Sequence, residues 1–130
     1  MTSPLPPSED PLTRRIIGAA LQVHRALRGP GLFESVYEEC LAWELADRGL
    51  AVRRQVAVPV RYRGITLPVA YRLDLLVEER VIVEVKAVER VHAIVDAQVL
   101  TYLRLLDLHV ALVVNFNVER LRDGIRRLVV

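Results

Sequence analysis

Three charged residues stand inside two strongly apolar segments of the chain. Asp74 lies within LDLLV, residues 73–77, and both Glu84 and Lys86 lie within VIVEVKAV, residues 81–88. Lys86 is also the only lysine among 18 lysines and arginines. Lysine is a compact point charge whose pKa moves readily, whereas arginine is a broad planar fork that stays charged. The retained lysine therefore favours a chemical role in a tight site.

The register of a predicted hairpin decides whether the two carboxylates meet. A three-residue loop at 78–80 pairs Val77 with Val81 and places Asp74 opposite Glu84. Directly opposed residues of antiparallel strands share a face, and their Cα atoms lie roughly 4.5–5.5 Å apart. A two-residue loop would shift the register by one and send Asp74 to the other face. The sequence thus predicts a loop of odd length.

Two carboxylates held so close repel each other unless a cation neutralises them. Mg²⁺ takes one or two carboxylates together with waters and phosphate oxygens of a substrate. Lys86 on the same face could stabilise negative charge on a phosphorus under attack, so the group suits metal-assisted phosphodiester hydrolysis. The alternative is a salt-bridged ladder on a solvated face, with Arg72 opposite Lys86. Both interpretations stay open at this point.

Further candidates lie on predicted helices. Gln98 and Tyr102 are four residues apart and therefore share a helix face. Glu34 occupies a first helical turn, where the helix dipole alone would favour an acidic residue. His24 stands beside an apolar stripe, which fits either a structural hydrogen bond or an approach to the site.

Hydrophobic periodicity predicts the elements that position these residues. Asp10 and Pro11 supply an N-cap and a first helical position. Helices are predicted to the stop at Gly29-Pro30-Gly31, over 32–48 and over 92–106, and strands over 51–62, 67–77, 81–88, 109–114 and 124–130. The first three strands have connections too short for anything but an antiparallel meander, whereas the helix at 92–106 allows a parallel crossover. Alternation along 51–62 predicts a single apolar face formed by Val52, Val56, Val58, Val60 and Tyr62.

The composition predicts one domain over 11–130, preceded by a flexible tail over 1–10 that is rich in proline and polar residues. The chain has 130 residues, 52% of them hydrophobic, which is enough for one core. It has a single cysteine, Cys40, and no apolar run of about 18 residues, so a cytoplasmic protein without a membrane segment is expected. The net charge of +2 is compatible with a polyanionic partner, whose phosphates Arg61 and Arg63 could contact.

Several stretches together resemble the GxxExxY protein family, a branch of the PD-(D/E)xK nuclease superfamily. The family's namesake motif is similar to Gly31-x-x-Glu34-x-x-Tyr37. The resemblance covers roughly residues 12–128 and also includes VHRALRGPG, Gln55, Arg61 to Gly64, Asp74, Glu84-Val85-Lys86, Gln98-x-x-x-Tyr102-Leu103 and Asn115-Phe116. Leu73 stands where the superfamily name has proline.

The resemblance implies an α/β, restriction-endonuclease-like core with a central mixed sheet of four to five strands flanked by helices. That sheet would be an antiparallel meander plus a further strand, with a Mg²⁺ or Mn²⁺ site on the hairpin. By position, Asp74 and Glu84 match the metal-binding carboxylates, Lys86 the catalytic lysine, and Glu34 an additional glutamate that some branches contribute. Gln98 and Tyr102 match a motif used near the site and the nucleic-acid backbone.

The resulting hypothesis is a metal-dependent nuclease that cuts DNA, or less readily RNA. Asp74 and Glu84 would bind the cation with Glu34 and the Val85 carbonyl, Lys86 would assist the attacking water, and Gln98 would position that water or the phosphate. The alternative is a non-catalytic nucleic-acid-binding or protein-interaction module that retains the fold. A subunit active only with a partner, and a homodimer that cuts both strands, also stay open.

Overall fold

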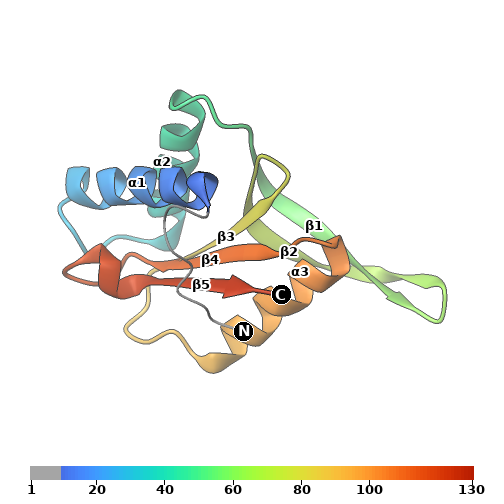
Figure 1. The fold of residues 1–130 in the computed structure, drawn as a ribbon. Helices are drawn as coiled ribbons and strands as arrows, with labels where there is room; N and C mark the ends of the chain where they lie inside the picture. Colours follow the sequence, from blue (N-terminus) through green and yellow to red (C-terminus); the bar gives the residue numbers. More distant parts are fainter. Residues whose placement is uncertain (1–9) are drawn as a thin grey trace.

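The computed structural model describes residues 10–130 (Figure 1). Its elements are α1 (Pro11–Ala26), α2 (Glu34–Asp47), β1 (Val52–Tyr62), β2 (Ile65–Val77), β3 (Val81–Lys86), α3 (Ala93–Leu106), β4 (Val110–Asn115), a short 3₁₀ helix η2 (Leu121–Gly124) and β5 (Ile125–Val129). Of the predicted tail, residues 1–9 lie outside the described part. Between residues 10 and 130, no helix has the length and apolar character needed to cross a membrane.

The five strands form one mixed sheet in the order β1-β2-β3-β4-β5. β1 pairs with β2 and β2 with β3 in antiparallel fashion. β4 is parallel to β3, and β5 is antiparallel to β4. α3 lies between β3 and β4 in the chain and forms the long crossover that a parallel pair of strands requires. The predicted mixed sheet flanked by helices is confirmed.

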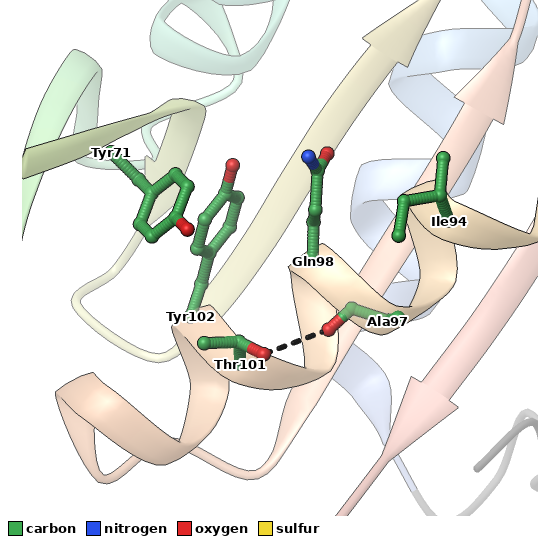
Figure 2. A pocket seen from close by; sticks show the side chains of 6 residues that line it. All are labelled: Tyr71, Ile94, Ala97, Gln98, Thr101 and Tyr102. Carbon is green, nitrogen blue, oxygen red and sulfur yellow. Dashed lines mark hydrogen bonds between the residues drawn. The ribbon is translucent and has the colours of Figure 1, made fainter.

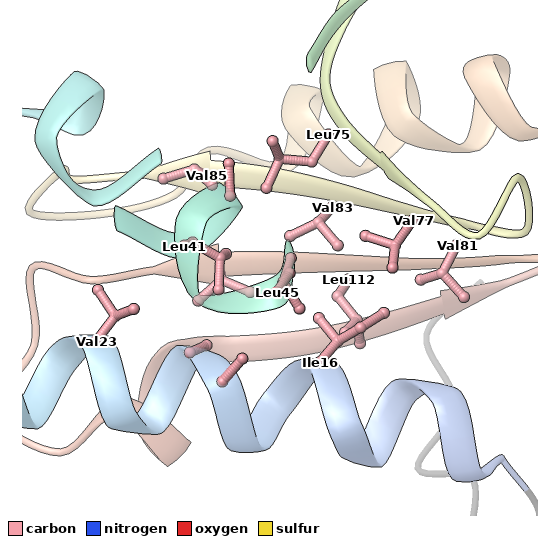
Figure 3. Packing of buried hydrophobic residues seen from close by; sticks show 14 of the residues in the cluster. Ile16, Val23, Leu41, Leu45, Leu75, Val77, Val81, Val83, Val85 and Leu112 are labelled. Atoms are coloured by element: carbon pink, nitrogen blue, oxygen red, sulfur yellow. The ribbon is translucent and has the colours of Figure 1, made fainter. Parts of the chain in front are cut away.

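Two apolar clusters fill the space on either side of the sheet. The first joins α1 and α2 to alternate residues of β3, namely Val81, Val83 and Val85 (Figure 3). The second joins α3 to the opposite face through Ile82. Since side chains alternate along a strand, Glu84 and Lys86 belong to the face of β3 that α3 covers. The polar residues of β3 therefore stand where a second apolar layer ends.

The β2–β3 hairpin has the predicted three-residue loop. β2 ends at Val77, β3 begins at Val81, and the two residues pair directly. Glu78 and Glu79 both adopt positive φ, which allows the chain to reverse within so few residues. The odd loop length fixes the register, so the parity that brings Asp74 to Glu84 is confirmed.

β1 differs from its prediction, because its apolar residues do not share one face. Val52 packs against the first cluster, whereas Val58 belongs to the second. Gln55 lies between them with a left-handed φ of 50°, which breaks the alternation. Its neighbour β2 changes face at the same level, since Leu75 lies in the first cluster and Leu73 in the second. Both strands therefore change the face of their apolar residues at the level of Gln55, beside the candidate site.

The β1–β2 hairpin is longer than predicted and extends beyond the rest of the sheet (Figure 1). β2 begins at Ile65, two residues earlier than expected, and a register shift between Pro59 and Arg61 separates the base of this hairpin from its tip. We call residues 57–72 the arm. The arm carries exposed Tyr62, Ile65 and Val69.

Candidate functional site

The backbone ladder between β2 and β3 ends at the pair Leu75–Val83, and two carboxylates continue the pairing from there. The Val85 N–H donates to Asp74 Oδ2 at 2.8 Å, and the Asp74 N–H donates to Glu84 Oε1 at 3.0 Å. Each carboxylate thus replaces a carbonyl that the diverging strands no longer supply. This reciprocal arrangement holds Asp74 and Glu84 side by side; we call them the carboxylate pair.

Burial and mutual repulsion make ionisation of both members of the carboxylate pair unfavourable. Glu84 is only 6% exposed, and burial followed by the charge of Asp74 raises the pKa of Glu84 to about 8. The pKa of Asp74 is raised as well, first by burial and then by the charge of Glu38, although the hydrogen bond from Val85 opposes the shift. Such a pair gains stability when a proton or a cation joins it.

Lys86 supplies a positive charge that acts on both carboxylates of the pair. Its charge lowers the pKa of both carboxylates, against the larger effect of burial. Within residues 10–130 it forms none of the close ion pairs, all of which use arginine. The alternative of an Arg72–Lys86 ladder is not formed, because the β2–β3 pairing ends at Leu75–Val83 and the Arg72 guanidinium donates to the Gln55 carbonyl at 2.9 Å. The charge of Lys86 therefore acts on both carboxylates, and its catalytic role stays a prediction.

Two polar residues that the sequence analysis did not place at the site support Asp74 from β1 and α2. Gln55 Nε2 donates to Asp74 Oδ1 at 3.3 Å and to both oxygens of Glu38 at 3.0 and 3.1 Å. Glu38 is buried and also accepts from Arg54 at 3.1 Å. Strict alternation along β1 predicts a solvated face for Gln55. The available signals were a glutamine within a valine-rich strand and a glutamate one helical turn after Glu34.

Glu34 lies at the start of α2 and reaches the end of β3. Its Oε2 accepts a hydrogen bond from the Ala87 N–H at 3.2 Å, just past Lys86. The connection before α2 passes through Gly31 at φ 113°, a conformation that residues with side chains rarely adopt. Across residues 10–130, no three or more His, Cys, Asp or Glu side chains form a group arranged to hold a metal ion. A part for Glu34 in metal binding consequently stays a prediction.

Tyr37 has a structural role. Its ring is fully buried and stacks on Phe116 at 4.6 Å between centroids. Its hydroxyl donates to the Gly29 carbonyl at 2.7 Å and accepts from the Leu32 N–H at 3.2 Å. These bonds fix the connection between α1 and α2, and with it the position of Glu34. The motif tyrosine thus orients the helix that carries the motif glutamate.

Replacing Tyr37 with phenylalanine is expected to lower the free energy of unfolding by about 1–3 kcal/mol, because two backbone groups lose their partner while the stacked ring remains. Urea unfolding followed by circular dichroism measures the change. Tyr62→Phe is the matched control, since that ring is 62% exposed and its substitution should leave the midpoint unchanged. Equal urea midpoints for Tyr37→Phe and the parent would contradict this structural role.

Asn115 and His24 also hold backbone in place. Asn115 Oδ1 accepts from the Val88 N–H at 3.1 Å and its Nδ2 donates to the Val88 carbonyl at 2.9 Å, which secures the chain after β3. His24 Nε2 lies 2.8 Å from the carbonyl oxygen of Val118. Of the two roles open to His24, the structural hydrogen bond is the one observed.

Tyr102 and Gln98 lie on α3, which covers the face of β3 that carries Glu84 and Lys86. Burial, followed by the charges of Glu84 and Asp74, raises the pKa of the Tyr102 hydroxyl. Gln98 is exposed one helical turn earlier. Both residues line a pocket of about 250 Å³ together with Tyr71 (Figure 2). The pocket therefore lies on the side of the sheet to which Glu84 and Lys86 point.

Arg61 and Arg63 lie near the tip of the arm, away from the base where the carboxylate pair stands (Figure 1). Arg61 pairs with Thr66, and the Arg63 guanidinium lies 5.7 Å from the centroid of the Tyr62 ring. Both arginines are exposed. Their contact with nucleic acid stays a prediction.

Comparison with known proteins agrees with this arrangement at the level of the superfamily. Searches of curated proteins and of solved structures gave no match. A family model described as the PD-(D/E)XK nuclease superfamily matches residues 10–128, nearly the whole chain. The match includes the hairpin with its carboxylate pair and lysine, and the helix with Gln98 and Tyr102. The chain belongs to the PD-(D/E)XK nuclease superfamily.

Proposed function

We propose that this protein is a divalent-metal-dependent nuclease of the GxxExxY branch that hydrolyses phosphodiester bonds of DNA, and less readily of RNA. The observation that carries the proposal is the carboxylate pair itself, with Lys86 beside it. Glu84 is buried, Asp74 is half-buried beside it, and both carboxylates have raised pKa values, so a cation between them would relieve their repulsion. Their chemistry is that of a cation site.

The donor set fits Mg²⁺ or Mn²⁺. Both ions accept hard oxygen ligands, and Mg²⁺ needs only one or two carboxylates when waters and phosphate complete its shell. Asp74 and Glu84 would hold the ion, with the Val85 carbonyl and Glu34 as further oxygen donors. When bound, the cation supplies positive charge that stabilises a phosphodiester under attack.

The remaining roles belong to side chains around the pair. The Lys86 ammonium would donate a hydrogen bond to the attacking water or to a phosphate oxygen and stabilise the negative charge that develops there. Gln98 would position the water or the phosphate with its exposed amide. Tyr102, Arg61 and Arg63 would contact the nucleic-acid backbone. The single cysteine suggests a reducing cytoplasm as the location of the protein. A homodimer would allow both strands of a duplex to be cut.

Replacing Asp74 with asparagine is the direct test of the metal site. The amide keeps the size of the side chain but removes one charge, so Mn²⁺ binding measured by calorimetry is expected to weaken more than about 100-fold. Cleavage of a DNA oligonucleotide in Mg²⁺ or Mn²⁺ should be lost in parallel. Asp107→Asn is the matched control, because Asp107 is exposed at the end of α3 in a left-handed conformation that asparagine also adopts.

A folded parent protein that neither binds Mn²⁺ at millimolar concentration nor cuts DNA or RNA would overturn the proposal. That result would favour the non-catalytic binding module. If the parent and Asp74→Asn bound Mn²⁺ equally well, the ion would have to bind at another place on the chain.

A further inference from the structure

The pocket on the side of the sheet that α3 covers has two differently built walls. Tyr71, from the base of the arm, forms one wall together with Tyr102, and Ile94 stands at the opposite end (Figure 2). Gln98, Ala97 and Thr101 complete the lining, so no charged side chain of residues 10–130 lines the pocket. A neutral pocket with aromatic and aliphatic walls suits a planar apolar group better than a phosphate or a metal ion.

The rings of Tyr71 and Tyr102 do not stack face to face. Their ring centroids are 5.6 Å apart and the ring planes are tilted by 49°. By contrast, Tyr37 and Phe116 lie nearly parallel, at 11°, and are fully buried. Tyr71 remains 45% exposed and Ile94 62% exposed. Part of the aromatic surface of Tyr71 is therefore available to a ring from outside the protein.

The volume and the location of the pocket indicate which part of a nucleic acid it could hold. At about 250 Å³ it lies just below the range of roughly 300–1,000 Å³ typical of pockets for drug-sized ligands. Tyr102 packs with Ile82 in the second cluster, on the face of β3 that also carries Glu84 and Lys86, so the pocket opens on the side of the sheet where the phosphate would be cut. In a nucleic-acid chain the nearest planar group to a phosphate is the base of the adjoining nucleotide.

Resting on the proposed nuclease function, we propose that this pocket is a nucleobase site in which Tyr71 stacks on an unpaired base next to the phosphate to be cut. A base inside a duplex is covered on both faces by its neighbours, so it must leave the stack to enter. The preferred substrate is therefore single-stranded or frayed at the point of cleavage. Because every base has a π-face, the site tolerates different sequences.

The test compares binding of a short oligothymidylate with binding of an abasic oligonucleotide of the same length. Fluorescence anisotropy is measured in Mg²⁺ on a Lys86→Ala background, which prevents cleavage. The background protein should prefer oligothymidylate, and adding Tyr71→Ala should reduce that preference roughly 5- to 150-fold, the usual effect of removing one aromatic stacking partner. Because the measurement is a ratio of two affinities, a general loss of phosphate binding would not alter it.

Two variants control for folding and for aromatic content. Tyr71→Phe keeps the ring and should keep the preference. Trp43→Ala removes an exposed aromatic residue of α2, which packs on the other face of the sheet, and should leave the ratio unchanged. An unaltered ratio in Tyr71→Ala, with cleavage still dependent on Lys86, would overturn the base site alone. Failure of both oligonucleotides to bind the background protein would overturn this inference together with the nuclease proposal.

Discussion

Lys86→Ala should lower the rate of metal-dependent DNA cleavage by at least about 100-fold, the usual cost of removing one preorganised charge from a developing anion. The fold should stay intact, because the half-buried Lys86 makes no close ion pair within residues 10–130 and its neighbours in β3 and β4 keep their backbone pairing. Steady-state cleavage of a fluorescent oligonucleotide measures the rate, and circular dichroism checks the fold.

Metal binding separates this effect from that of the carboxylates. Lys86 repels a cation, so Mn²⁺ should bind the Lys86→Ala protein at least as tightly as the parent, whereas Asp74→Asn loses binding. Loss of cleavage with metal affinity retained is the signature of a residue that acts on the substrate. A Lys86→Ala protein that cuts as fast as the parent would refute the assignment.

Lys86→Arg asks why this chain keeps its one lysine. The guanidinium retains the charge but presents a broad planar fork, which should place that charge away from the attacked phosphate. We expect Lys86→Arg to recover less than about one tenth of the parent rate. Arg80→Lys, a change of the same type in the exposed β2–β3 loop, should leave the rate unchanged. Full activity in Lys86→Arg would mean that charge alone is required.

The register of the site could be predicted from the sequence because it depends only on local chain length. Once the loop at 78–80 has three residues, the period of two along β2 and β3 leaves Asp74 no other partner than Glu84. The same register predicted Arg72 opposite Lys86, and that pair does not form, since the strands separate beyond the Leu75–Val83 pair. Side chains continue to alternate along each strand, but the pairing of residues ends where carboxylates replace the backbone hydrogen bonds between β2 and β3.

The support for Asp74 could not be predicted because it depends on one unusual backbone conformation. A strict alternation sends Gln55 to solvent, yet its φ of 50° turns the side chain toward Asp74 and Glu38. Non-glycine residues rarely adopt positive φ, so no pattern of apolar residues signals it. Glu38 also approaches from α2, 17 residues away from Gln55 in sequence. Contacts across elements of this kind follow from packing, which periodicity does not contain.

Without metal, the protein should become less stable as the pH rises from about 4.5 to about 8. The first value is the ordinary pKa of glutamate, and the second is the raised pKa of Glu84 in the folded state. Between them the folded protein binds more protons than the unfolded chain does, so the free energy of unfolding falls with increasing pH. A tenfold difference in proton affinity between the two states corresponds to about 1.4 kcal/mol. The total effect belongs to the carboxylate pair, since Asp74 titrates with Glu84.

Glu84→Gln isolates this contribution from all other titrating groups. The amide has no proton to lose, and its oxygen can still accept from the Asp74 N–H. Urea unfolding in EDTA should give the parent and Glu84→Gln similar stability at about pH 5, and should make Glu84→Gln the more stable protein at about pH 8. Glu89→Gln is the matched control in the same segment, because Glu89 is exposed. Curves of the parent and Glu84→Gln that run parallel across this pH range would refute the burial of an uncompensated charge.

Adding Mg²⁺ at about pH 8 should reverse the order of the two proteins. A ligand that binds only the folded state stabilises it in proportion to the logarithm of its concentration over its Kd, and Glu84→Gln lacks the carboxylate that holds the ion. The parent should therefore gain stability with Mg²⁺ while Glu84→Gln gains little. If the charge that destabilises the metal-free protein is also the charge that binds the cation, as proposed, both effects should disappear together. A mutation that removed one effect and kept the other would separate the stability of this fold from its chemistry.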